Sequence, residues 1–379
     1  MKILLIGEYS RLHNSLKEGL TALGYDVIIV GTGDNFKKYN IDYSIYPSFF
    51  ADYWLLRKFK NLIYKFTKFN LEETEKGLRF YKLLPKLKGF DHIQLINSDA
   101  IETHPALEIW LYKKLLRQNR QMSLLVCGDD TPVIDYYLHE DLKYSILTPY
   151  HEDKQLKDYF YYSLKYTKTR YRKLFSWIKE HSLAIITSDL DYEIPMKDSG
   201  YATHFIPNPI NTDKIAFIPL EIKDKVVIFL GINRLSYTKK GIFYFEEALE
   251  IIRKKYPYTV DIIITENIPY NEYIKLYDSA HILLDQVYSY DQGYNALEAM
   301  AKGKVVFTGA EDEFTKHYNL IERVAVNALP SVASLVNELS YLIDNPNEII
   351  TMSKRATAFI EKEHNYIKIA KKYLEVWNL

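Results

Sequence analysis

The segment DQGYNALEAMAKGK, residues 291–304, combines a glycine, a glutamate and a run of small apolar residues. It follows the apolar stretch HILLD (281–285) and precedes VVF (305–307). This order predicts a strand, a helix over 293–301 that begins near Gly293, and a second strand. Such a succession is the repeating unit of a parallel sheet with helices on its faces.

The same alternation recurs along most of the chain. In the first half, the predicted strands are KILLI (2–6), DVIIV (26–30), HIQLI (92–96), SLLVC (123–127) and LAIIT (183–187), with helices over 14–23 and 105–116. In the second half, VVIFL (226–230) and DIIIT (261–265) are further strands, with helices over 241–255 and 271–279. The turn-rich HFIPNPIN (204–211) is suited to a linker. We expect two α/β domains, at 1–207 and 208–360, and a terminal helical segment at 361–379.

Composition excludes several classes of protein. The 379 residues contain 49 Lys and Arg and 49 Asp and Glu, so no net charge attracts nucleic acid, and we expect no such partner. Cys127 is the single cysteine, so no intrachain disulfide can form. The opening MKILLIG is interrupted by Glu8 and Arg11 before it could serve as a signal or a membrane span. We therefore expect a cytoplasmic protein.

The helix at 293–301 has features of a nucleotide site. Open parallel sheets bind ligands at the carboxyl ends of their strands, and this helix follows such an end. The amides of Gly293, Tyr294 and Asn295 would offer a phosphate site at its positive terminus. Glu298 could accept hydrogen bonds from the two hydroxyls of a ribose. The alternative is a solvent-facing glutamate on an amphipathic helix.

The extended segment YDQGYNALEAMAKGKVVFTG (290–309) resembles the signature of the family-four GT-B glycosyltransferases. Gly293 falls on the family glycine, and Glu298 on the second family glutamate, which holds the nucleotide ribose. Tyr290 stands where the family has its first glutamate, which contacts the donor sugar. The resemblance implies that Tyr290, Asp291 and Gln292 lie beside that sugar, and the substitution leaves the sugar and the stereochemistry open.

A second segment, GINRLSYTKKGIFYFEEAL (231–249), resembles the family's strand-end arginine followed by Lys-Gly at a helix start, with one residue more between them. The resemblance implies that Arg234 and Lys240 bind the donor diphosphate, with Lys239 as the alternative because of the shift in register. Two cations would stabilise the negative charge that grows on the leaving nucleotide. Surface charge is the other interpretation of the lysines.

The resemblance is weaker in the first half. GEYSRLHNSLKEGL (7–20) occupies the family's first loop, where Gly7, Glu8 and Tyr9 are the candidate residues. The loop lacks the G-x-G-x-x-G pattern, which counts against a dinucleotide enzyme. Acceptors bind this domain in the family.

Two further loops at strand ends carry the candidates for catalysis. NSDAIETH (97–104) contains His104, and CGDDTP (127–132) contains Asp129 and Asp130. Transfer to a hydroxyl requires that the hydroxyl be oriented and deprotonated, and Asp129 or Asp130 is our hypothesis for that role. Capping of a helix by these aspartates is the alternative.

SDLD (188–191) imitates an Asp-x-Asp metal motif, but its position at a helix start favours capping by Ser188 or Asp189. His, Cys and acidic residues show no zinc spacing. We predict catalysis without a metal ion or another cofactor.

Residues 49–70, FFADYWLLRKFKNLIYKFTKFN, mix aromatic and basic residues with Asp52 as the single acid. That composition is suited to a helix lying on an anionic membrane, where a lipid-linked acceptor would be found. A core helix with a basic solvent face is the alternative.

The resemblance implies two facing Rossmann-like domains with the last helix crossing back to the first. It also implies transfer of a sugar, with retention, from a nucleoside diphosphate sugar to a glycan or lipid-linked glycan in bacterial polysaccharide or glycolipid assembly, in the cytoplasm or on the inner face of the membrane. Two alternatives stay open: a sugar-nucleotide epimerase of the same fold, and a non-catalytic scaffold.

Overall fold

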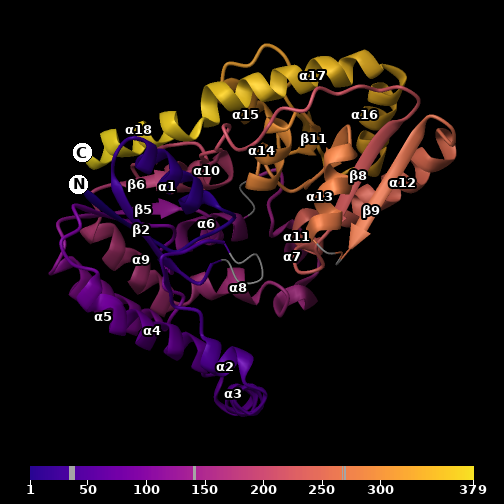
Figure 1. The fold of residues 1–379 in the computed structure, drawn as a ribbon. Helices are drawn as coiled ribbons and strands as arrows, with labels where there is room; N and C mark the ends of the chain where they lie inside the picture. The colour runs from indigo at the N-terminus through magenta and orange to yellow at the C-terminus, as the bar shows by residue number, and fades with distance from the viewer. Residues whose placement is uncertain (34–38, 140–141, 267, 269) are drawn as a thin grey trace.

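The computed structural model describes residues 1–33, 39–139, 142–266, 268 and 270–379. Two parallel sheets, each with helices against it, lie side by side (Figure 1). The first sheet has the strand order β3-β2-β1-β4-β5-β6-β7 and the second β12-β11-β10-β8-β9. The predicted α/β architecture with two parallel-sheet domains is confirmed.

The first sheet is built from β1 (Lys2–Ile6), β2 (Asp26–Gly31), β3 (Tyr43–Ser44), β4 (His92–Leu95), β5 (Met122–Val126), β6 (Ile185–Thr187) and β7 (His204–Phe205). Its helices are α1 (Leu12–Ala22), α2 (Ser48–Asp52), α3 (Trp54–Thr67), α4 (Leu71–Leu83), α5 (Pro105–Leu116), α6 (Thr131–Leu138), α7 (Thr148–Glu152), α8 (Tyr161–Leu164), α9 (Thr169–His181) and α10 (Leu190–Asp198). Three short 3₁₀ helices are η2 (Leu84–Lys86), η3 (Lys154–Lys157) and η4 (Lys165–Thr167). Every residue of β4 and β5 is buried, because helices cover both faces of a parallel sheet.

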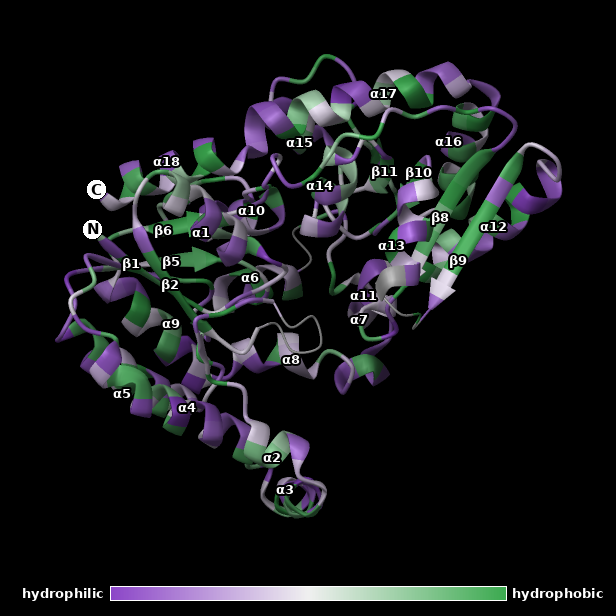
Figure 2. Ribbon diagram, in the orientation of Figure 1, coloured by the Kyte–Doolittle hydropathy of each residue, from purple (hydrophilic) through white to green (hydrophobic). Residues whose placement is uncertain are grey.

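The second sheet is built from β8 (Val226–Ile232), β9 (Val260–Glu266), β10 (Ile282–Leu284), β11 (Val305–Thr308) and β12 (Val326–Asn327). Its helices are α11 (Tyr237–Lys240), α12 (Ile242–Lys255), α13 (Tyr270–Ser279), α14 (Tyr294–Ala301), α15 (Asp312–His317), α16 (Val332–Asp344) and α17 (Pro346–Phe359). Leu284 is in register with Leu230 and Phe307, so the carboxyl ends of β8, β10 and β11 meet at one edge. Figure 2 shows β5 and β8 in the colour of hydrophobic residues.

The chain crosses between the domains twice, and the two crossings are hydrogen-bonded to each other. Ile210, in the linker after β7, donates its amide to His364 O (2.7 Å) and accepts from the amide of Tyr366 (3.1 Å). His364 ends a π-helical turn, η5 (Ile360–His364), that separates α17 from α18 (Tyr366–Trp377). The passages in both directions therefore lie together.

The last helix, α18, lies on the first domain against α1 (Figure 1). The helices approach so closely at Gly19 that a Cβ there would lie 2.4 Å from Tyr366 O. Trp377 is fully buried, stacks on His92 with ring centroids 4.4 Å apart, and donates its indole N–H to Gln94 Oε1 (2.9 Å). The predicted terminal helix that crosses back to the first domain is confirmed.

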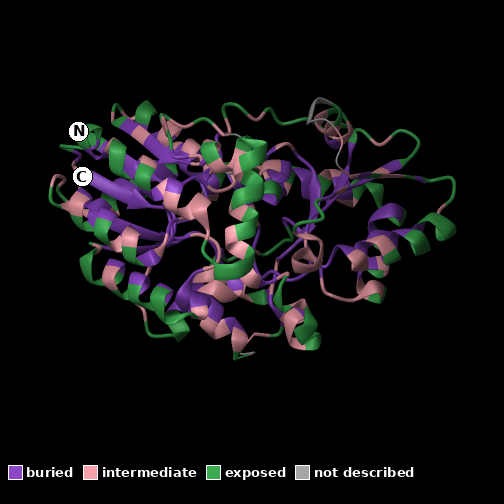
Figure 3. Ribbon diagram, turned by 90° about the horizontal axis from the view of Figure 1, so that it is seen from below, coloured by how far each residue is buried: buried purple, intermediate pink, exposed green. Residues whose placement is uncertain are grey.

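Helix α3 stands apart from the rest of the first domain. It contacts α2 and α4, and it contains no buried residue. In Figure 3, which views the molecule from below, α3 lies in front and shows no buried residue along its length. A core helix with a basic solvent face is therefore the wrong interpretation of residues 49–70. No helix in the described ranges is long and apolar enough to span a bilayer.

Candidate functional site

Arg234 and Lys240, the two residues predicted to bind the diphosphate, lie at the carboxyl edge of the second sheet. Arg234 follows β8, and its Nη2 is 2.6 Å from Oε2 of Glu266, the last residue of β9. Its guanidinium lies over the Tyr237 ring, 4.8 Å from the centroid. Lys240 ends α11, and its Nζ is 2.7 Å from Asp285 Oδ1. Each cation is thus held by a carboxylate that follows or ends a strand.

Asp285 connects Lys240 to the start of α14. It directly follows β10, is almost fully buried, and also accepts a hydrogen bond from Asn295 Nδ2 (3.1 Å). The Thr308 hydroxyl lies 3.5 Å from its other oxygen. Sequence analysis missed Asp285, although its place at the end of HILLD was a usable signal. The result is a lysine and an amide side chain fixed at the positive end of a helix.

Gly293 occupies the N-cap position of α14 with φ −70° and ψ 164°, a conformation that any residue can adopt. A Cβ placed there would lie 3.7 Å from Gln286 Nε2 and 4.0 Å from Asp285 Oδ2, which is ordinary van der Waals contact. Neither the backbone nor the neighbouring atoms therefore require glycine. What glycine provides is open space in front of the helix terminus, close to Lys240.

Tyr294 belongs to the contact between the domains. Its buried hydroxyl is hydrogen-bonded to Ser15 Oγ of α1 and to Pro209 O of the linker (2.9 Å). The side chain therefore fixes α14 against the first domain, and only the backbone amide of Tyr294 remains a candidate for phosphate.

Glu298 lies one turn after Tyr294 on the same helix and is half-buried. Burial alone would lower the pKa of Arg11, but the carboxylates of Glu18 and Glu298 outweigh burial and raise it. Arg11 lies in the loop after β1, so the Glu298 carboxylate lies within electrostatic reach of that loop. Burial raises the pKa of Tyr277 in α13, and the Glu298 carboxylate raises it further. The Glu298 carboxylate is thus near both α13 and the loop after β1.

Lys239 points away from Lys240 and reaches the first domain. Its Nζ donates to Ser163 Oγ (2.7 Å) and lies 3.3 Å from Asp129 Oδ2. Its amide donates to the hydroxyl of Tyr159 (3.3 Å). The structure thus separates the two neighbouring lysines, with Lys240 at the helix terminus and Lys239 bridging the domains.

The three residues predicted beside the donor sugar are all buried where the domains meet. The Tyr290 hydroxyl accepts from the Lys143 amide (3.0 Å), and Asp291 Oδ2 accepts from the Leu190 amide at the start of α10 (3.2 Å). Gln292 Nε2 donates to the carbonyl of Gly309 (2.6 Å). Their side chains hold this segment in place, and two of them contact the first domain directly.

Asp189 and Asp191 of the first domain meet Asp291 of the second. Asp191 accepts from the Ser289 hydroxyl (2.5 Å) and the Tyr290 amide (2.8 Å). Burial raises the pKa of Asp191 to about 6 and that of Asp291, with a contribution from Asp191, to about 7. Burial and these two carboxylates raise the pKa of Asp189 as well.

The predicted capping by Ser188 or Asp189 is wrong. Asp189 occupies the N-cap position of α10, but its side chain makes no capping hydrogen bond. The Ser188 hydroxyl is buried and has no hydrogen-bond partner among the described residues. The domain contact places the Asp189 carboxylate near Asp191 and Asp291, an effect that local sequence does not reveal.

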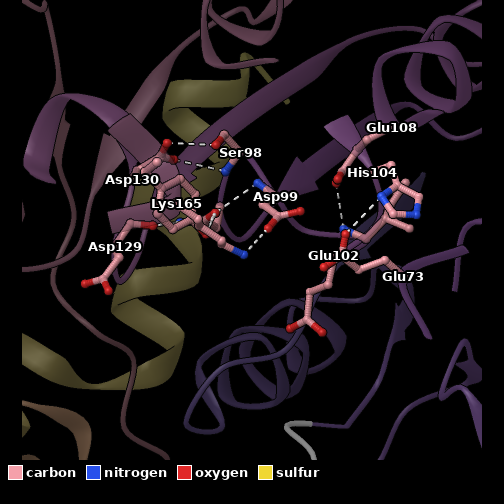
Figure 4. A network of polar contacts seen from close by, with 12 residues as sticks. Glu73, Ser98, Asp99, Glu102, His104, Glu108, Asp129, Asp130 and Lys165 are labelled. Carbon is pink, nitrogen blue, oxygen red and sulfur yellow. Dashed lines mark hydrogen bonds and ion pairs between the residues drawn. The ribbon is translucent and has the colours of Figure 1, made fainter. Parts of the chain in front are cut away.

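Asp130 caps α6. Its Oδ1 accepts from the Thr131 amide (2.7 Å) and the Ser98 hydroxyl (2.7 Å), and its Oδ2 accepts from the Ser98 amide (3.1 Å). It is fully buried, which raises its pKa to about 6. The capping interpretation therefore holds for Asp130, whose carboxylate is taken up by Ser98 and Thr131. Asp129 differs, because its carboxylate turns outward (Figure 4) and meets Lys239.

His104 is not grouped with Asp129. It precedes α5 and faces α4, with Nδ1 3.1 Å from Glu73 Oε2 and Nε2 3.0 Å from Thr74 Oγ1. Its ring stacks on Phe69, with centroids 4.4 Å apart. Figure 4 shows His104 and Asp129 on opposite sides of Asp99. The structure therefore does not bring His104 together with Asp129, because α4 and Phe69 hold its ring, and a catalytic role for His104 stays a prediction.

The first-loop residues shape the loop itself. Gly7 has φ 85°, and a Cβ there would lie 2.2 Å from Ile96 Cγ2, so this position requires glycine. The Glu8 carboxylate accepts from the Asn14 amide (2.8 Å) and side chain (2.5 Å). Burial, with the nearby carboxylates, raises the pKa of Tyr9.

Lys165 was missed by sequence analysis. Its Nζ is 2.5 Å from Asp99 Oδ2 after β4 (Figure 4); Asp99 is almost fully buried, and Lys165 is partly buried. Lys165 comes from the short helix η4, whose sequence carried no signal for this contact. In the described ranges no group of three or more His, Cys, Asp or Glu is placed to hold a metal ion, and metal-free catalysis stays a prediction.

Comparison with known proteins agrees with this arrangement. Residues 241–375 match the family model described as glycosyl transferase-like. A sucrose-phosphate synthase from Thermosynechococcus elongatus has a similar structure (15% identity, TM-score 0.59), covering 100% of this chain and 98% of its own. The chain therefore has the GT-B fold, and its residues 241–375 are similar to glycosyl transferase-like proteins.

Two other solved structures resemble the chain over nearly its full length. Anabaena HepE in complex with UDP and glucose shares 12% identity, with a TM-score of 0.61 and coverage of 100% of this chain and 99% of HepE. A UDP-GlcNAc 2-epimerase from Neisseria meningitidis shares 12% identity, with a TM-score of 0.52 and coverage of 99% of both chains. No curated protein matches the chain in sequence.

Proposed function

We propose that the chain transfers a sugar from a nucleoside diphosphate sugar to a hydroxyl acceptor. The observation that carries this proposal is the group at the start of α14, where Lys240, Asn295 and the open N-cap at Gly293 converge on Asp285. Lys240 immediately precedes the region that matches the glycosyl transferase-like family, and the other three lie within it. A helix N-terminus beside a lysine is a site for a phosphate group.

In this proposal the donor lies across the carboxyl edge of the second sheet. Arg234 and Lys240 bind the diphosphate together with the amides of α14, and Glu298 binds the ribose. Lys240 is then shared between Asp285 and a phosphate oxygen, so that Asp285 keeps the ammonium oriented before the donor arrives. Cations held in advance stabilise the charge that develops on the leaving group without reorganisation.

We assign the acceptor to the first domain, at the outward carboxylate of Asp129. Lys239 holds this carboxylate from the second domain, so the pair lies where the two domains meet. We propose that Asp129 orients the acceptor hydroxyl or the donor sugar. Retention of configuration is proposed from the resemblance of 290–309 to the family signature, with buried Tyr290 in place of its first glutamate.

The biological setting that we propose is bacterial surface polysaccharide or glycolipid assembly at the cytoplasmic face of the membrane. The base stays open between uracil and guanine, and HepE, solved with UDP, makes uridine donors the first to test. A panel of nucleotide sugars, scored by thermal stabilisation and by nucleotide release, identifies the donor, because a bound ligand stabilises the native state by RT ln(1 + [L]/Kd).

Lys240→Ala tests the diphosphate site. Loss of one preorganised cation is expected to cost about 2–4 kcal/mol in kcat/KM, or about 30- to 1,000-fold. The variant also leaves Asp285 buried without its cation, so Lys240→Ala/Asp285→Asn, which restores neutrality, is measured beside it. Lys255→Ala, at the far end of α12, is the matched control, since Lys255 bonds Ser340 Oγ (3.0 Å) in the same domain. Wild-type turnover in the folded double variant contradicts the assignment.

Incubation with donor alone separates the other functions. A transferase releases nucleotide slowly without an acceptor and faster with one, whereas an epimerase converts the donor sugar and retains the nucleotide. A scaffold releases no nucleotide from any donor.

A further inference from the structure

Helix α3 carries a stripe of exposed apolar side chains. Leu55, Phe59, Leu62 and Phe66 follow one another at spacings of four, three and four residues, which places them on one face of the helix. Their exposed fractions lie between 52% and 77%. Further large exposed side chains flank the stripe at both ends of the segment: Phe49, Tyr53, Trp54 and Phe69. Continuous apolar surface of this kind marks a docking site.

Cations border this stripe. Arg57, Lys58, Lys65 and Lys68 are exposed, and Asp52 is the single acid in residues 49–70. Lys58 Nζ lies 4.0 Å from the centroid of the Trp54 ring. An apolar face bordered by lysines and aromatic rings is complementary to a lipid surface, where the rings enter the acyl boundary and the ammonium groups meet anionic headgroups. A second copy of this chain would instead bring cations against cations.

Helix α3 also adjoins a cavity in the first domain that several lysines line. Tyr64 of α3 lies beside Tyr161, which lines a cavity of about 550 Å³. The charged residues of its lining are Lys157, Lys165, Lys168 and Arg172, with Asp135 and Asp158, and Arg172 is paired with Asp135. Burial and the neighbouring cations lower the pKa of Lys168, as expected where positive charges are gathered. Lys165 also pairs with Asp99 after β4, so one residue of the cavity's lining is tied to the carboxyl edge of the first sheet.

We propose that α2 and α3 dock this protein on an anionic lipid bilayer, with the stripe of α3 inserted at the headgroup boundary. The lysine-lined cavity beside α3 then receives the anionic headgroup of an acceptor carried by the same bilayer. This inference rests on the proposed function, because it names the class of acceptor for that transfer.

Co-sedimentation with vesicles tests the docking. Phosphatidylcholine vesicles with phosphatidylglycerol are expected to bind the full chain, and phosphatidylcholine alone to bind it at least tenfold more weakly. Phe66→Glu removes one ring that the bilayer would bury and should weaken binding about tenfold or more. Lys58→Glu/Lys65→Glu should weaken it at least about thirtyfold, since each cation contributes about fivefold. Ile321→Glu is the matched control, since Ile321 is fully exposed on the second domain, and binding should not change.

Nucleotide binding, measured on the same samples, keeps the two proposals distinguishable. All four proteins are expected to bind nucleotide equally, because α3 lies outside the donor site. Equal sedimentation with neutral and anionic vesicles, or none with either, overturns the docking even where nucleotide binding is intact. A dimer that Phe66→Glu converts to a monomer, without vesicle binding, also overturns it and assigns the stripe to self-association. If the wild type binds vesicles but no nucleotide, the result contradicts the proposed function instead.

Discussion

Replacing Gly293 by alanine separates a structural glycine from one that keeps space for a ligand. The new Cβ would have its nearest neighbours at 3.7 Å and 4.0 Å, and φ −70° suits alanine. Alanine is a poorer N-cap than glycine, but it reduces the conformational entropy of the unfolded chain by about 0.4–1 kcal/mol. The two effects oppose each other, so the free energy of unfolding should change by less than about 1 kcal/mol.

The same methyl group should weaken nucleotide binding. If a phosphate packs against the N-cap, an added methyl overpacks that contact at a cost of about 1–3 kcal/mol, or about 5- to 150-fold in Kd. Calorimetric titration with UDP and GDP measures the change, and urea unfolding measures stability. Gly309→Ala is the contrasting variant, because its Cβ would lie 2.5 Å from Asp291 O and should destabilise the fold. Unchanged nucleotide affinity in a folded Gly293→Ala protein would refute the reasoning.

Two further predictions concern stability. The Asp291 pKa of about 7 lies above the unfolded value of about 3.9, so the native state binds more protons and stability should fall from pH 4 to pH 7, on the order of a few kcal/mol. Asp189→Asn removes one of the repelling carboxylates, so the melting temperature should depend less on pH between pH 5 and 8. A melting temperature that falls with pH as steeply as in the wild type contradicts this. Trp377→Ala should cost about 3–5 kcal/mol of unfolding free energy in urea, against less than about 0.5 for exposed Trp54→Ala, and similar losses in both would show that the α18 contact contributes little.

The interior strands could be predicted from the sequence because burial on both faces leaves continuous apolar runs. KILLI at 2–6 coincides with β1, and DVIIV at 26–30 differs from β2 by one residue. The two-residue strands β3, β7 and β12 are too short to show any periodicity, and β7 fell within the predicted linker. α3 was ambiguous because amphipathicity alone does not tell whether the apolar face meets protein or another surface.

The candidate site was predictable where it depends on position relative to a strand or helix end. Gly293 and Asp285 both have such positions, although Asp285 was not selected. Contacts between domains had no local signal, as in the approach of Lys239 to Asp129. An acidic residue directly before a helix is typical of an N-cap, and Asp130 does cap α6. Asp189 makes no capping hydrogen bond, because its carboxylate lies in the contact between the domains, which local sequence does not show.

The role of Glu298 in gripping the ribose is tested most directly by a double-mutant cycle. Binding of UDP, or of GDP if that is the nucleotide bound, is compared with binding of its 2′,3′-dideoxy analogue in the wild type and in Glu298→Ala. Hydrogen bonds to a carboxylate are worth about 1.5–3 kcal/mol, so the wild type should prefer the hydroxylated nucleotide by about 10- to 150-fold, and the variant should not discriminate. Equal preference in both proteins would contradict a ribose held by Glu298.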